Sequence, residues 1–127
     1  TVRVDGREMY LDPALLDAPT TGPAAGDDEV LLLPGFDEYL LGFKDRSLML
    51  DAEHTRAIIP GGNGVFQATI VRGGRVIGTW KRTLTRARAV VELRPLVHLG
   101  AADRSRVEDA LKPYAHFVGR PVQARWA

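Results

Sequence analysis

Residues 31–47 read LLLPGFDEYLLGFKDRS. The leucine run at 31–33 favours a short buried strand, which Pro34 and Gly35 end. Apolar and aromatic residues then recur at helical spacing, so we expect a short helix around residues 37–41. The segment is interpreted as a junction whose packing anchors are Phe36, Tyr39, Leu40 and Phe43. Polar ties across the junction are expected from Asp37, Lys44, Asp45 and Arg46.

Before this junction, residues 2–11 predict a small β-hairpin, because Asp5-Gly6 separates two alternating runs. Asp12 and Pro13 are typical of a helix start, so one helical turn through residue 16 is expected. Residues 18–29 are rich in Pro, Gly, Ala, Thr and Asp and are interpreted as a flexible linker. The expected organisation is therefore a hairpin over residues 1–17, a linker over 18–29 and one α+β domain over 30–127.

After the junction, Asp51 is expected to cap a second short helix that ends at Pro60. Three strands follow in a meander over residues 65–71, 76–82 and 86–93, with Gly73-Gly74 as a turn that needs positive φ at both positions. Alternation places four residues on one face of the third strand: Ala87, Ala89, Val91 and Leu93. On the middle strand, Trp80 is expected to share a face with Val76 and Gly78 and to anchor the core.

The longest helix is predicted over residues 103–117, with Ser105 and Glu108 as a capping box and Gly119 as its stop. Pro113 predicts a kink or a break, because it deletes a helical N–H. Residues 121–126 alternate and predict a final strand. The fold class is α+β: an antiparallel β meander or small partly open barrel, with two short helices and one longer C-terminal helix.

Length and composition limit the number of domains and the kinds of site that the chain can form. The 127 residues suffice for one core, and the absence of cysteine excludes disulfides and thiolate metal sites. No apolar run approaches membrane-spanning length, so we expect no membrane contact and a cytoplasmic location. Because the chain starts with Thr1 in strand-like sequence, we interpret it as either a processed protein or a fragment of a longer one, and we favour the fragment.

Charge is divided unevenly along the chain. Residues 1–60 carry twelve acidic and five basic side chains, and residues 61–127 carry four acidic and twelve basic ones. A basic meander of this kind can face a polyanion, but it can also be a solvated sheet face or fold back on the acidic half. The candidate phosphate-contacting residues are Arg72, Arg75, Lys81, Arg82, Arg86 and Arg88.

Catalytic patterns are missing from the sequence. The closest carboxylates are adjacent in sequence, and His54, His98 and His116 lie far apart, so neither a catalytic dyad nor metal-ligand spacing is recognised. Gly61-Gly62-Asn63-Gly64 is not expected to join a regular element, and it lacks the lysine of a phosphate-binding loop. We predict no catalytic residue, no metal and no cofactor. A free-standing enzyme would need a pocket joining His54, Asp45 and Arg46.

Four segments in one order carry a family resemblance: LLPGFDEYLLGFKDRS (32–47), LDAEHTRAIIPGGNGVF (50–66), IVRGGRVIGTWKR (70–82) and VELRPL (91–96). Together they resemble the C-terminal part of winged-helix DNA-binding-domain proteins of the AlkZ-like DNA glycosylase family. The motif residues within them are Phe36, Asp37, Tyr39, Asp45, Arg46 and Trp80. The hairpin at residues 1–17 looks like the wing of a preceding winged-helix unit.

The resemblance implies tandem winged-helix units that form a basic concave surface, and base removal from DNA by the glycosylase members. Their catalytic glutamine motif is absent here, because Gln67 and Gln123 are the only glutamines and lie in unrelated segments. No catalytic residue is therefore carried over, and whether the parent protein is an active enzyme stays open.

Two hypotheses follow. In the first, the chain is a noncatalytic C-terminal domain that helps to bind the backbone of double-stranded DNA through its basic meander. In the second, it braces the upstream winged-helix domains without touching DNA. The sequence does not indicate an oligomeric state.

Overall fold

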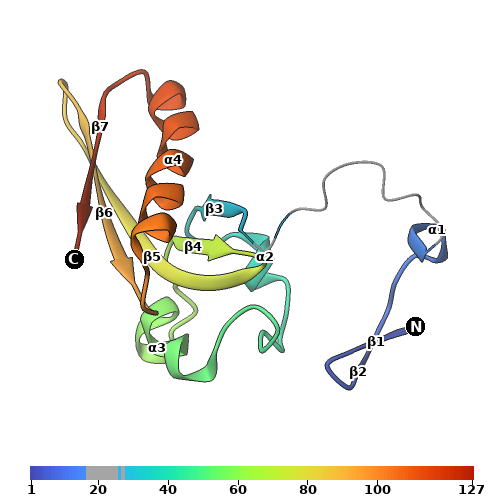
Figure 1. Ribbon diagram of the computed structural model, residues 1–127. Coiled ribbons are helices and arrows are strands. Elements are labelled where there is room, and N and C mark those ends of the chain that lie inside the picture. Colours follow the sequence, from blue (N-terminus) through green and yellow to red (C-terminus); the bar gives the residue numbers. More distant parts are fainter. Residues whose placement is uncertain (17–25, 27) are drawn as a thin grey trace.

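The computed structural model describes residues 1–16, 26 and 28–127, and its elements follow one another along the chain as coloured in Figure 1. The strands are β1 (Val2–Val4), β2 (Arg7–Met9), β3 (Val30–Leu33), β4 (Thr69–Arg72), β5 (Arg75–Leu84), β6 (Ala89–Pro95) and β7 (Val122–Trp126). The helices are α1 (Pro13–Leu16), α2 (Glu38–Leu41), α3 (Thr55–Ile58) and α4 (Ala101–Val118), with single 3₁₀ turns η1 (Ala52–His54) and η2 (Pro60–Gly62).

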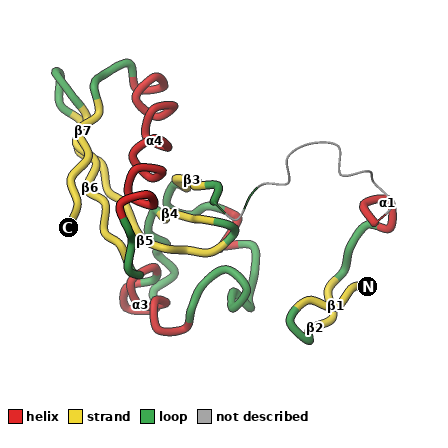
Figure 2. Tube along the Cα trace, viewed as in Figure 1, coloured by secondary structure: helices red, strands yellow, loops and turns green. Residues whose placement is uncertain are grey.

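Five strands form the main sheet in the order β3-β4-β5-β6-β7 (Figure 2). Every neighbouring pair is antiparallel except β6 and β7, which α4 connects in parallel. The α+β class is thus confirmed, with short helices and one longer C-terminal helix. The expected antiparallel meander is confirmed in β4, β5 and β6. The alternative of a small partly open barrel is corrected, because the sheet stays open, and the parallel pairing of β7 was not expected.

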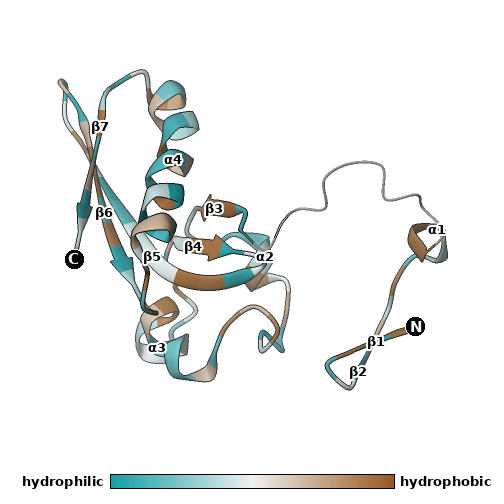
Figure 3. Ribbon diagram, viewed as in Figure 1, coloured by the Kyte–Doolittle hydropathy of each residue, from teal (hydrophilic) through white to brown (hydrophobic). Residues whose placement is uncertain are grey.

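The sheet separates two apolar clusters. One packs β4 and β5 against α2, α3 and the loop between them, around Leu40, Leu50 and Ile58. The other packs β5, β6 and β7 against α4, around Leu93 and Val107. Figure 3 shows alternating apolar and polar colours along α4, which is the pattern of a helix with one buried side. Among the described residues, no helix other than the short ones near β4 and β5 covers the face of β5–β7 that points away from α4 (Figure 1).

A β-bulge in β5 decides which side chains face which cluster. Val71 pairs with Val76, whereas Ile70 pairs with Gly78, so Ile77 is an extra residue opposite β4. Val76 accordingly packs in the cluster with α2 and α3, and Trp80 packs in the cluster with α4. The expectation that Trp80 shares a face with Val76 is wrong for this reason.

The boundaries of the meander differ from those expected. Residues 65–68 lie outside β4, and β6 begins at Ala89, so the arginines at 86 and 88 belong to the β5–β6 turn instead of a strand. The expected alternation holds from Ala89 onward, since Ala89, Val91 and Leu93 are all fully buried. Gly73 and Gly74 adopt φ of 53° and 78°, which confirms the predicted turn.

Helix α4 is longer than predicted at its start. It begins at Ala101 after the N-cap Gly100, so Ser105 lies inside the helix and the expected capping box is wrong. The helix also continues through Pro113 without the expected break, held by the packed residues Val107 and Leu111. Its end is as predicted: Gly119 takes a left-handed conformation with φ of 63°.

Smaller expectations near α3 also change. Asp51 occupies the N-cap position of η1 but makes no side-chain capping bond, because its carboxylate binds Arg75 instead. Pro60–Gly62 forms one 3₁₀ turn, although the glycine cluster was not expected to join a regular element. In the described residues, no helix combines the length and apolar character needed to cross a membrane.

The N-terminal hairpin confirms the predicted β1 and β2, with Val2 opposite Met9. A two-stranded hairpin is at best marginally stable alone. Arg7 joins this hairpin to the junction by donating hydrogen bonds to Asp45 and Ser47.

The expected linker over 18–29 falls mostly outside the described residues. Of its last two residues, Asp28 forms an ion pair with Arg106 of α4 at 3.1 Å, and the carbonyl of Glu29 accepts a bond from Gly73.

The Arg7–Asp45 contact should depend on pH. The bond from Arg7, followed by those from Ser47, lowers the pKa of Asp45 from 3.8 to about 2. Because the folded pKa is depressed, the contact is fully present above pH 3.8 and is lost as pH falls through about 2. Carboxyl NMR titration should give that value, and Arg7→Gln should raise the pKa of Asp45 toward its ordinary range, with the bonds from Ser47 retaining part of the decrease. An unchanged titration in Arg7→Gln would contradict this assignment.

Candidate nucleic-acid interface

The side of β5–β7 opposite α4 forms a polar surface that we call the open face. By register it carries Thr79, Lys81, Thr83, Val90, Glu92, Arg94, Gln123 and Arg125. Lys81 of β5 lies opposite Glu92, and Arg125 of β7 lies on its other side, so this carboxylate is flanked by cations of the two neighbouring strands. A polar hollow of about 280 Å³ lies here, with Thr79, Lys81 and Arg94 in its lining. The open face is thus a shallow surface of net positive charge.

The turn that joins β5 to β6 (residues 85–88), together with the neighbouring Arg120, forms a basic end that we call the hairpin tip. Thr85 closes the turn by donating to the carbonyl of Arg88 at 2.9 Å and accepting from the Arg88 amide at 3.1 Å. Arg120, from the α4–β7 loop, donates to the carbonyl of Thr85. Neither residues 82–91 nor residues 113–127 contain an acidic side chain. Among the residues that the structure describes, Arg86, Arg88 and Arg120 form no side-chain ion pair, so the hairpin tip is a cationic projection.

Two of the six sequence-predicted phosphate contacts lie elsewhere and are bound to carboxylates. Arg72 pairs with Asp103 of α4 at 2.7 Å, and this bond lowers the pKa of Asp103. Arg75 pairs with Asp51 and donates to the carbonyl of Leu48 at 3.1 Å. Through Asp51–Arg75 and Asp28–Arg106, the basic half does fold back on the acidic half in part.

The other four predicted phosphate contacts lie on β5 or in the turn that joins β5 to β6: Lys81, Arg82, Arg86 and Arg88. Within the described part of the chain, Lys81, Arg86 and Arg88 take part in no side-chain ion pair. Arg82 points to the α4 side, where it donates to the hydroxyl of Tyr114 at 3.2 Å. Lys81 lies on the open face, and Arg86 and Arg88 lie at the hairpin tip. Arg86 and Arg88 thus lie together at the hairpin tip, Lys81 lies apart from them on the open face, and Arg72 and Arg75 lie at the opposite end of β5.

The motif residues of the junction have distinct surroundings. Asp37 caps α2 by accepting from the Tyr39 amide at 2.9 Å, and Arg46 binds the carbonyl of Leu40 while its guanidinium lies 5.0 Å from the centre of the Phe66 ring. Trp80 is half-buried, with its indole donating to the carbonyl of Leu33 at 2.9 Å. Leu40 is buried as expected. Phe36 and Phe43 are 56% and 48% exposed, which corrects their interpretation as packing anchors.

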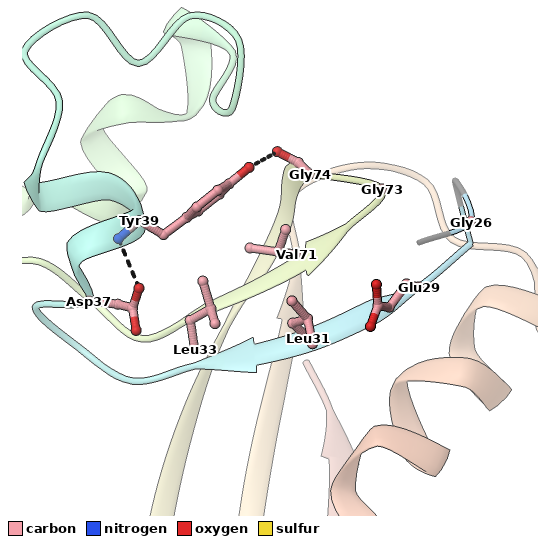
Figure 4. A pocket seen from close by; sticks show the side chains of 9 residues that line it. All are labelled: Gly26, Glu29, Leu31, Leu33, Asp37, Tyr39, Val71, Gly73 and Gly74. Atoms are coloured by element: carbon pink, nitrogen blue, oxygen red, sulfur yellow. Dashed lines mark hydrogen bonds between the residues drawn. The ribbon is translucent and has the colours of Figure 1, made fainter. Parts of the chain in front are cut away.

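An apolar pocket of about 440 Å³ lies between the β3–β4 edge and α2. Figure 4 shows Leu31, Leu33 and Val71 on one side of the two strands, next to the Tyr39 ring. The Tyr39 hydroxyl donates to the carbonyl of Gly74, and burial raises its pKa. The lining also includes the carboxylates of Glu29 and Asp37, but Asp37 caps α2 and the Tyr39 hydroxyl is bound to a backbone carbonyl.

The residues of the enzyme hypothesis do not gather at one site. Asp45 binds Arg7, Arg46 binds a backbone carbonyl, and His54 lies 3.9 Å from Glu53. Asp51, Glu53 and His54 do bring potential ligand atoms within 4.8 Å of one another. Because Arg75 already binds the Asp51 carboxylate, the ion pair accounts for the position of that residue.

Sequence reasoning missed Arg120 and Arg125 as members of the basic surface. Arg120 comes next to Arg86 and Arg88 only because β7 pairs in parallel with β6 after a long crossover. The available signal was weaker: the last fifteen residues contain no acid. A charge count over that window would have pointed to the C-terminal strand.

Comparison with known proteins places this fold in a family. A sequence model described as "DNA glycosylase AlkZ-like" matches residues 1–117. The chain belongs to the AlkZ-like DNA glycosylase family. It is 32% identical over 81 residues to an interstrand DNA cross-link repair glycosylase of Streptomyces sahachiroi, a match that covers 63% of this chain and 21% of that protein.

The AlkZ-like assignment also holds in three dimensions. The chain is similar to the solved structure of Streptomyces sahachiroi DNA glycosylase AlkZ, with a TM-score of 0.70 and 27% sequence identity. That similarity covers 98% of this chain and 32% of the AlkZ chain. The family expectation from the sequence is confirmed, and the chain corresponds to about a third of its solved relative.

Proposed function

We propose that this AlkZ-like domain is noncatalytic and binds the phosphate backbone of duplex DNA through the hairpin tip, with the open face as an extension. The observation that carries the proposal is the hairpin tip itself, where Arg86, Arg88 and Arg120 lie together without an acidic neighbour in sequence. Phosphate contacts need positive charge at defined positions and carry no sequence information. The family relationship supports DNA as the polyanion.

The salt dependence of duplex binding tests this proposal. Each phosphate that a protein cation neutralises adds about 0.9 to the slope of log affinity against log salt. We expect the double variant Arg86→Ala/Arg88→Ala to reduce that slope by about 2. When salt is raised from 50 to 200 mM, the affinity of the double variant should therefore fall by a factor roughly tenfold smaller than that of the unmodified chain. Fluorescence anisotropy with a labelled duplex measures both quantities.

A matched control removes the same net charge elsewhere. Arg3→Ala/Arg56→Ala changes two exposed arginines of β1 and α3 and should leave the slope unchanged. A slope that falls equally in both double variants would mean that only net charge matters. Affinity that does not respond to salt would exclude backbone binding altogether.

A second candidate function is the bracing of winged-helix domains in a longer AlkZ-like protein. The apolar pocket beside α2 favours it, because Leu31 at its rim is 47% exposed and a partner side chain would bury it. In that case, mixing this chain with the separately produced winged-helix part of a longer family protein should raise the thermal midpoint of that part. Leu31→Lys should abolish the increase, and Leu31→Met should keep it.

A further inference from the structure

Phe36 has a backbone conformation that its residue type does not favour. Its φ is 60°, in the left-handed region that bulky residues rarely adopt. The turn around it explains why. A side chain on Gly35 would lie 2.9 Å from the carbonyl oxygen of Phe66, so Gly35 is held against a neighbouring backbone, and Asp37 on the other side is fixed as the cap of α2.

Glycine or asparagine would fit position 36 better. The sequence instead has a phenylalanine whose ring is 56% exposed, so packing does not compensate for the unfavourable backbone. A residue that conflicts with its local structure without a gain in burial is a reason to look for a role in binding.

The Phe36 ring lines a groove that we call the Phe36 groove. The groove encloses about 400 Å³, within the range of about 300–1,000 Å³ that is typical of ligand clefts. Its lining residues are Pro34, Gly35, Phe36, Val65, Phe66, Gln67, Ala68, Trp80, Lys81 and Arg82. None of them is acidic, and two are cations from β5. Val65 adds a second exposed apolar side chain, 41% exposed.

The groove continues onto the open face. Gln67 and Lys81 line both the Phe36 groove and the polar hollow that contains Thr79 and Arg94. An exposed aromatic ring beside a row of cations is the combination with which proteins bind single-stranded nucleic acid: the ring stacks on a base and the cations follow the phosphates. In an intact duplex the bases are stacked on one another and present no face to such a ring.

We propose that the Phe36 groove binds an unstacked nucleotide of single-stranded DNA, with its base against Phe36 and its phosphate beside Lys81. Gln67 lines the same groove, and its side-chain amide offers a donor and an acceptor to a base edge. The proposal extends the backbone-binding function, on which its choice of DNA as the ligand rests, by adding a preference for unpaired over duplex DNA.

The test compares a single-stranded 12-nucleotide oligothymidylate with an intact duplex, using the whole 127-residue chain. Phe36→Asn and Phe36→Gly remove the ring but suit the backbone, so their thermal midpoints should be no lower than that of the unmodified chain. We expect about a tenfold loss of affinity for the single strand in both variants, with duplex affinity within twofold. Lys81→Gln should reduce the salt slope for the single strand by about 0.7.

Phe117→Ala is the matched control, since Phe117 is 83% exposed and lies outside the groove. It should leave both affinities unchanged. Unchanged single-strand affinity in Phe36→Asn, or an equal loss for single strand and duplex, would overturn the proposal. So would a thermal midpoint several degrees lower in Phe36→Asn and Phe36→Gly, because the ring would then be a packing element. An unchanged salt slope for duplex DNA in Arg86→Ala/Arg88→Ala would contradict only the proposed role of the hairpin tip, because neither arginine lines the Phe36 groove.

Discussion

Replacing Leu93 by alanine is expected to lower the free energy of unfolding by about 2–5 kcal/mol. Leu93 is fully buried in the middle of β6, where it pairs with Trp80 of β5 and Trp126 of β7 beneath α4. Truncation removes apolar contacts on three strands and a helix at once and leaves a cavity that rigid strands cannot close. Urea denaturation followed by circular dichroism measures the change.

Two controls separate this effect from a general loss of apolar surface. Leu93→Met conserves volume and should cost less than about 1.5 kcal/mol. Leu31→Ala removes a side chain that is 47% exposed and should cost well under half as much as Leu93→Ala. Equal losses for Leu31→Ala and Leu93→Ala would show that the cluster beneath α4 is not the centre of stability.

Replacing Gly78 by alanine should destabilise the sheet by about 1–3 kcal/mol, and valine by more. A Cβ at position 78 would lie 2.8 Å from the carbonyl oxygen of Arg94 and 3.2 Å from Cδ1 of Ile70. The oxygen belongs to the backbone of β6, so the clash can be relieved only by moving one strand away from the other. Chemical denaturation should report the loss, and amide exchange should become faster in the β5–β6 pair.

Gly100→Ala provides the comparison, because a Cβ there would meet nothing within 4 Å and the residue has negative φ. As the N-cap of α4 it should lose at most about 1 kcal/mol. If Gly78→Ala lost no more than Gly100→Ala, the close approach of β5 and β6 would not be energetically important.

The parts of the fold that the sequence predicted are those with local causes. Asp5-Gly6 and Gly73-Gly74 need positive φ, so both hairpin turns could be recognised. Gly119 ends α4 for the same reason. The start of α4 could not be predicted in this way, because Gly100 has no side chain to cap the helix and Ser105 offered a more familiar pattern.

The missed features depend on distant residues. The bulge at Ile77 follows from how β4 meets β5, and alternation within β5 alone gives no sign of it. The parallel pairing of β7 depends on where α4 packs. The same limit applies to the site: Arg72 and Arg86 look alike in sequence, and only the position of Asp103 on α4 shows that Arg72 is bound to a carboxylate.

The extra residue at Ile77 also sets the phase of everything that follows it in β5. Side chains alternate with a period of two, so one inserted residue exchanges the two sides of the strand from that point on. Without it, Lys81 would lie against α4 and Trp80 would face water. The charge of the open face and the apolar character of the face against α4 thus both depend on this one inserted residue. The number of residues between Val76 and Gly78 therefore constrains the chain more strictly than the identity of most residues in β5.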